Sequence, residues 1–161
     1  MKWLIALLAL IAVAPAMACP PPPPGYRPPS PEEALRSRVM GAPNIVYAVV
    51  ESAIQGEGSA LNRTAPGHIR IMHVYKGGLR MGQRIPMYGL LARTDCGNIE
   101  YSREHARQGA YGVLLMRNWN GQDPVPFVRF ESQATVDEML RLGLIESAGG
   151  GRQAATGAQA N

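Results

Sequence analysis

Residues 68–88 constrain the fold of this chain more than any other stretch. An extended run rich in β-branched and aromatic residues enters a Lys76-Gly77-Gly78 corner, and a second short run, 84–88, leaves it. Extended runs on both sides of a glycine corner favour neighbouring strands. We therefore predict an antiparallel pair of strands within a small barrel.

Three further runs predict the remaining strands. Residues 44–54 form an apolar run rich in β-branched residues, residues 110–117 are apolar on both faces, and residues 125–131 alternate. Polar, glycine-containing loops and a long connection over residues 89–107 separate the strands. A sheet of five strands leaves exposed edges unless it closes. We therefore predict a mainly β fold, a five-stranded OB-fold (Greek-key) barrel.

A helix precedes these strands and another follows them. Ser30 is a suitable N-cap before a proline, and Gly41 ends the first helix after about two turns. Residues 132–145 predict the closing helix, in which Thr135 and Glu138 have the spacing of a capping box. The predicted barrel thus has a short N-terminal helix and a C-terminal helix.

The first eighteen residues have the pattern of an export signal. Lys2 supplies the positive start, residues 3–13 are apolar, and residues 16–18 form an A-x-A cleavage site. The apolar run is shorter than the ~20 residues that span a bilayer. We predict a cleaved signal peptide, with an uncleaved anchor as the alternative.

The remaining chain divides into three parts. Residues 19–30 form a proline-rich arm, because proline fixes φ and donates no hydrogen bond. Residues 31–147 form the OB-fold domain. Residues 148–161, with three successive glycines, have nothing apolar to bury and are predicted to be disordered.

Two cysteines, Cys19 and Cys96, are the only ones in the sequence. In an oxidising compartment the simplest interpretation is one disulfide between them. It would stabilise the fold by ~4 kcal/mol in the chain-entropy description. Two alternatives stay open: a lipoprotein peptidase would leave Cys19 acylated, and Cys96 could be a nucleophile with His105 as its base.

Charge and motif content exclude several classes of function. The net charge is +4 with basic and acidic residues interspersed, which argues against a nucleic-acid surface. The sequence contains none of the common hydrolase, phosphate-loop or dinucleotide motifs. His68 and His73 would lie on opposite faces of a regular strand and would not share a metal. We therefore expect no enzyme, cofactor or metal site.

Two groups of side chains remain. Glu100 and Glu104 are a helix turn apart in the long connection, where we expect both to be solvated. Four tyrosines are candidates to line a groove, although core packing and the barrel rim explain them equally well. They are Tyr75, Tyr88, Tyr101 and Tyr111.

An ordered set of short motifs carries a resemblance to a known family. The set comprises Cys19 after a signal peptide, a Glu-Ala-Leu helix, the strand 44–50, the corner 74–77, Asp95-Cys96-Gly97 and the strand 109–115. This order resembles the N-terminal domain of tissue inhibitors of metalloproteinases and their bacterial relatives. The similarity covers roughly residues 19–131.

The resemblance implies both a fold and an activity. Those proteins are OB-fold barrels of the netrin-like type. Their first cysteine chelates a protease's catalytic zinc through its α-amino nitrogen and carbonyl oxygen, in the open coordination position. The resemblance assigns that role to Cys19, held by a disulfide to Cys96. The predicted mature N-terminus differs from the family pattern, because Pro21 stands where the family has a second cysteine.

These observations lead to one expected function and two alternatives. We expect an exported, non-enzymatic OB-fold domain, periplasmic or secreted, that binds an unknown protein partner. The first alternative is a metalloprotease inhibitor that chelates the protease zinc through Cys19. The second is an envelope protein with a structural role, held at the membrane by lipid on Cys19.

Overall fold

The computed structural model of the protein describes residues 21–56, 65–94 and 97–146. The predicted signal peptide, both cysteines and the predicted tail from residue 148 lie outside the described residues. Within the described part, no helix is long and apolar enough to cross a membrane.

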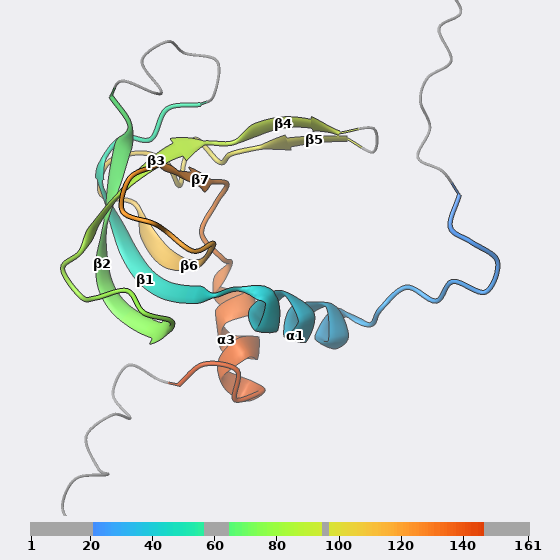
Figure 1. The fold of residues 1–161 in the computed structure, drawn as a ribbon. Helices are drawn as coiled ribbons and strands as arrows, with labels where there is room; N and C mark the ends of the chain where they lie inside the picture. The colour runs from blue at the N-terminus through green and yellow to red at the C-terminus, as the bar shows by residue number, and fades with distance from the viewer. Residues whose placement is uncertain (1–20, 57–64, 95–96, 147–161) are drawn as a thin grey trace, which may run out of the picture.

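One curled five-stranded sheet forms the body of the structure (Figure 1). Its strands lie in the order β6-β1-β2-β3-β7, and all neighbours are antiparallel except β3 and β7, which run parallel. The bounds are Asn44–Ser52 for β1, Gly67–Lys76 for β2, Arg84–Gly89 for β3, Tyr111–Met116 for β6 and Val125–Phe127 for β7. The predicted mainly β fold and its central antiparallel pair are confirmed.

Irregular register between β1 and β2 contributes to the curl. Pairing shifts three times along these strands, and Glu51, Met72 and Tyr75 are the residues left without a partner in the register. Bulges of this kind bend a strand and increase its right-handed twist. The sheet therefore curves toward a half-barrel instead of lying flat.

The outer edges of the sheet approach each other at the seam of the half-barrel. β6 and β7 are not paired, but the chain after β7 runs back to β6. There the Glu131 backbone N–H donates a hydrogen bond to the Val113 carbonyl over 2.8 Å. The remainder of the seam is a groove between Leu114–Arg117 and residues 126–129. The barrel is thus only partly closed.

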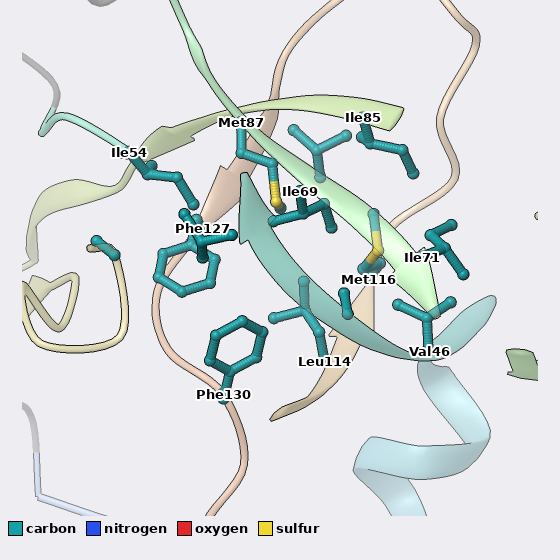
Figure 2. Close-up of a cluster of buried hydrophobic side chains, with 14 residues drawn as sticks. Val46, Ile54, Ile69, Ile71, Ile85, Met87, Leu114, Met116, Phe127 and Phe130 are labelled. Carbon is teal, nitrogen blue, oxygen red and sulfur yellow. The ribbon is translucent and has the colours of Figure 1, made fainter. Parts of the chain in front are cut away.

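Apolar side chains fill the concave side of the sheet (Figure 2). Every strand of the sheet contributes to this core, and the rings of Phe127 and Phe130 meet edge to face at 5.3 Å. The labelled members in Figure 2 are Val46, Ile54, Ile69, Ile71, Ile85, Met87, Leu114, Met116, Phe127 and Phe130.

A second core lies on the outer face of the sheet. Helices α1 (Pro31–Gly41) and α3 (Gln133–Arg141) pack there against β1 and β6. Its buried members are Leu35, Val39, Ala42, Ile45, Val113, Met139 and Ile145. β1 is therefore buried on both faces where Ile45 and Val46 alternate, which accounts for its continuous apolar sequence.

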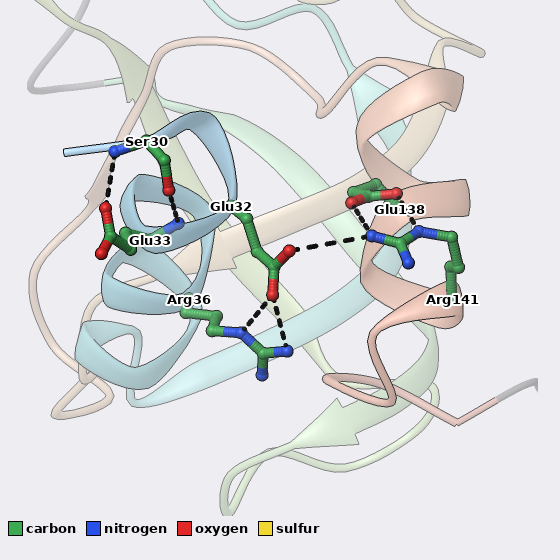
Figure 3. A network of polar contacts seen from close by, with 6 residues as sticks. All are labelled: Ser30, Glu32, Glu33, Arg36, Glu138 and Arg141. Atoms are coloured by element: carbon green, nitrogen blue, oxygen red, sulfur yellow. Dashed lines mark hydrogen bonds and ion pairs between the residues drawn. The ribbon is translucent and has the colours of Figure 1, made fainter.

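Polar contacts fix both ends of α1. At its start, the Ser30 hydroxyl accepts from the Glu33 N–H and the Glu33 carboxylate accepts from the Ser30 N–H (Figure 3). At its end, the Lys76 ammonium donates to the carbonyls of Val39 and Met40 at 2.9 and 3.1 Å. The predicted N-cap and helix end are confirmed, and Lys76 ties the last turn of the helix to β2.

Ion pairs also connect α1 with α3. Glu32 accepts from Arg36 on its own helix and lies 4.0 Å from Arg141, which is bonded to Glu138 (Figure 3). These groups are largely exposed, so they orient the helices more than they stabilise them.

Several expectations about the helices and strands differ from the structure. The connection 89–107 contains a hairpin of β4 (Leu91–Thr94) and β5 (Gly97–Glu100), which projects from the half-barrel in Figure 1. The N-cap of α3 is Ser132, whose hydroxyl accepts from the Thr135 N–H, so Thr135 is not the cap. The last strand ends at Phe127, because its continuation crosses to β6 instead of following β3.

The ring of Tyr101 packs directly against two glycines at one end of the barrel. A Cβ atom added to Gly56 would lie 2.6 Å from a ring carbon of Tyr101, and one added to Gly89 would lie 2.7 Å from another. The Tyr101 backbone N–H donates to the Leu90 carbonyl, which fixes the ring above these glycines. Tyr101 therefore packs against the interior core.

We predict that Gly89→Ala destabilises the fold because the added methyl overlaps the Tyr101 ring. Overpacking of this kind costs ~1–3 kcal/mol. Urea denaturation should show this loss, whereas Gly78→Ala, where a Cβ would meet nothing within 4 Å, should change stability little. In a Tyr101→Ala background the Gly89→Ala penalty should shrink. An unchanged penalty there would contradict the proposed overlap.

Candidate binding groove

A groove on the outer face of the sheet is lined by tyrosines from three strands. Tyr47 lies on β1, Tyr75 on β2 and Tyr111 on β6, and the groove has a volume of ≈ 740 Å³. Tyr47 and Tyr111 face one another at a centroid distance of 6.1 Å with a tilt of 55°. Burial raises the pKa of Tyr75 from its ordinary value of 10.0. The Tyr75 phenol is therefore neutral at neutral pH, and the three tyrosines offer amphipathic contact groups.

Strand pairing brings these residues together. Tyr47 pairs with Val113 on β6 and with His73 on β2, so its side chain lies between the two flanking strands. The ring of His73 packs edge-on against Tyr75 at 4.6 Å. Tyr111 is 68% exposed and forms the outer lip of the groove.

Charged and polar groups form the opposite wall. Arg38 from α1 pairs with Glu131, whose side chain is only 13% exposed, and Arg129 lies beside them. Thr135 and Gln133, from the first turn of α3, complete this wall. The groove thus has an aromatic floor and a polar rim, an arrangement that suits binding more than chemistry.

His105 also lines the groove, but its ring nitrogen is already engaged. The Phe130 backbone N–H donates to His105 Nδ1 over 3.2 Å. An accepting Nδ1 places the proton of the neutral ring on Nε2. His105 therefore positions the Phe130 segment. Its predicted alternative role, as base for Cys96, stays untested because Cys96 lies outside the described residues.

Of the four tyrosines that we expected as candidates to line a groove, two line it. Tyr75 and Tyr111 line it, whereas Tyr88 does not and Tyr101 packs over Gly89. Tyr47 is the member that the sequence did not reveal, because it lies within an apolar run. Its alternation with the inward-facing Val46 and Ala48 is the signal that could have identified it.

Neither His68 with His73 nor Glu100 with Glu104 forms a site in the described residues. The bulge at Met72 changes the alternation of β2, so His68 and His73 both lie on the outer face, against the expectation of opposite faces. His68 contacts the Ser52 hydroxyl at 3.2 Å, and His73 contacts Tyr75. In the described ranges no three His, Cys, Asp or Glu side chains gather as metal ligands. Glu100 and Glu104 are exposed, as expected.

Both cysteines lie outside the described residues. Thr94 pairs with Gly97 across the β4–β5 hairpin, so the chain between them carries Asp95 and Cys96. Cys19 precedes the described arm. The disulfide, the lipid and the zinc-chelation roles of Cys19 therefore all remain predictions.

On the outer face of the sheet, one carboxylate joins three strands. Glu51, a bulge residue of β1, accepts from Arg70 on β2 and from Arg84 on β3, the latter over 2.6 Å. Burial alone would raise the pKa of Glu51, but the hydrogen bonds from both arginines outweigh it and lower the pKa from 4.5. Glu51 thus ties the outer face of the sheet together.

Comparison with known proteins finds no matching family, no similar curated protein and no similar solved structure.

We predict that the stabilisation due to Glu51 depends on pH. A carboxyl whose pKa is lowered by folding stabilises the fold above its unfolded pKa, and loses that effect as pH falls through the folded pKa. Urea midpoints of the wild type and Glu51→Gln should therefore differ at pH 7 and converge below pH 4.5. Arg84→Gln should reduce the pH-dependent part. An equal difference at both pH values would contradict the ion-pair assignment.

Proposed function

We propose that this protein is an exported, non-enzymatic OB-fold domain that binds a protein partner in the periplasm or outside the cell. The observation that carries the proposal is the groove formed by Tyr47, Tyr75 and Tyr111. Tyrosine is enriched at protein interfaces because it combines a large apolar area with a polar tip and few rotatable bonds.

The strand order supports the OB-fold assignment. In an OB-fold the first three strands form an antiparallel meander, the fourth pairs with the first, and the fifth runs beside the third. Here β1, β2 and β3 form the meander, β6 pairs antiparallel with β1, and β7 pairs parallel with β3. The β4–β5 hairpin is an insertion between the third and fourth strands of that scheme.

The groove chemistry favours binding over catalysis. Its side chains offer aromatic faces, hydroxyls and the Arg38–Glu131 ion pair, and the ring of His105 is held by the Phe130 amide. A nucleophile paired with an oriented base is the arrangement that covalent catalysis requires. The described lining residues supply neither a thiol nor a hydroxyl bonded to this histidine.

We predict that partner binding depends on Tyr111. Tagged wild-type protein should capture a defined partner from an envelope extract of its source cells, and Tyr111→Ser should weaken that capture at least tenfold. Met81→Ser is the matched control, because Met81 is 70% exposed and lies outside the groove. Equal capture by Tyr111→Ser and wild type, or no partner above background, would sink the proposal.

A metalloprotease inhibitor is the second candidate. The strand order agrees with the barrel of the family that the sequence resembles, and Cys96 lies in the sequence between the paired residues Thr94 and Gly97. In this proposal the Cys19 α-amino nitrogen and carbonyl oxygen displace the water on the protease zinc. The Cys19–Cys96 disulfide holds that chelating end in place.

We predict that one additional alanine ahead of Cys19 abolishes inhibition by this mechanism, because it removes the free α-amino group from the chelating residue. The assay would compare Ki values of the mature and extended proteins on a panel of zinc metalloproteases. Undiminished potency of the extended protein would exclude chelation by Cys19. Tyr111→Ser, in turn, should leave this inhibition unchanged.

A lipid-anchored structural role remains the third proposal, and intact mass distinguishes it. Acylation of Cys19 adds the mass of the lipid and leaves Cys96 as a free thiol. A Cys19–Cys96 disulfide lowers the mass by two hydrogens and adds no lipid. The same measurement on protein from the cell envelope also tests the proposed cleavage after Ala18.

A further inference from the structure

The described residues of the proline-rich arm, 21–29, belong neither to the lining of the tyrosine groove nor to the barrel core. Residues 21–29 are all exposed and extend away from the barrel ahead of α1 (Figure 1). The Tyr26 N–H donates to the Pro23 carbonyl over 3.0 Å, and Gly25 has φ 82°, which together define a type II turn. The arm thus presents stiff, solvated proline on both sides of one glycine.

The arm has the chemistry that a tyrosine groove recognises. Consecutive prolines favour the polyproline II helix, which loses little entropy on binding because it is already extended. Grooves lined by aromatic side chains bind such segments by packing the pyrrolidine rings against their aromatic rings. Tyr47 and Tyr111 pack against one another at a tilt, with 6.1 Å between ring centroids, and their exposed faces offer an aromatic surface of this kind.

A second depression continues the tyrosine groove along the helices. It has a volume of ≈ 380 Å³, lies between α1 and α3, and includes Pro31 and Leu35. Arg38 and Thr135 line both this depression and the tyrosine groove. Together they form a track that is longer than the tyrosine site alone and suits an extended segment.

In the structure the arm leads away from the tyrosine groove of its own barrel (Figure 1). Pro28, Pro29 and Pro31 fix φ and so limit the conformations of the chain between the turn at Gly25 and α1. Gly25 is about 15 Å from Ser30 at ~3.1 Å per residue, and Arg38 is about 12 Å further at ~1.5 Å per residue. Residues 21–24 span only about 12 Å, much less than this return path.

We propose that the polyproline arm of one copy occupies the tyrosine groove of a second copy, so that the protein forms a dimer by reciprocal exchange of arms. This inference rests on the proposed binding groove and names the segment that fills it. Each copy offers the same arm and the same groove, so a two-fold axis satisfies both sites at once. An external partner of the groove then competes with the arm.

Mass measurement of the purified mature chain by light scattering tests the exchange. Wild type and Met81→Ser should be dimers at tens of micromolar, whereas Tyr111→Ser and a variant lacking residues 20–26 should be monomers. The deletion keeps the Ser30 cap, and circular dichroism should show the same fold in all four proteins. A monomeric wild type, or a dimer that survives Tyr111→Ser or the deletion, overturns the proposal.

A synthetic peptide of residues 20–29 tests the groove itself. It should bind the arm-deleted monomer saturably, and Tyr111→Ser should weaken the affinity at least tenfold. A peptide with serine in place of each proline should not bind. Absence of binding by the proline peptide overturns the exchange, as does equal binding by both peptides.

The outcomes separate this inference from the proposed function. Capture of a partner that requires Tyr111, by a protein that is monomeric with its arm intact, leaves the proposed function standing and overturns the exchange. A Tyr111-dependent dimer that captures nothing supports the exchange and overturns the proposed function. Where both hold, deletion of the arm should increase capture.

Discussion

Burial of β1 on both faces is the constraint on which the rest of the structure depends. Val46, Ala48 and Val50 point into the half-barrel, while Ile45 points to the helices. A strand with two apolar faces must be buried on both of them. A curled sheet of five strands can bury only the inner face of its own strands. Curling of the sheet covers the inner face, and docking of α1 and α3 covers the outer face.

The helices cover only part of the outer face, and the groove begins where they end. Ile45 lies beneath α1 and α3, whereas Tyr47, two residues further along the same face, is only half-buried. Lys76 fixes the end of α1 to β2 on this face. The aromatic floor is therefore a consequence of helix placement and of strand alternation.

Much of this arrangement could be predicted from local sequence signals. The Ser30 cap and Gly41 gave the first helix, and the glycine corner after Lys76 gave the central strand pair. The signals that failed were those set by distant contacts. β4 and β5 are short strands whose pairing shows no periodicity over four residues each, and the bulge at Met72 reverses alternation without any local marker.

The groove was predictable only in part for the same reason. Tyr75 and Tyr111 belong to strands that are not adjacent in the sheet, and Tyr47 on the strand between them unites them. Pairing of β1 with β2 and β6 involves contacts between residues far apart in sequence. A single sequence indicates each strand but not which strands are neighbours. Tyr101 was also a candidate groove residue, but its ring packs over Gly56 and Gly89, which are distant in sequence, and so belongs to the core side.

Closure of the barrel and formation of the groove are coupled through one residue. The backbone N–H of Glu131 bonds to Val113 at the seam, while its largely buried carboxylate pairs with Arg38 on α1. The same short segment carries Phe130 into the core and Arg129 to the groove. Opening of the seam would therefore displace the polar wall of the groove. A ligand that bridges this wall and the tyrosines stabilises the closed state by the free energy of its binding, because it binds that state better.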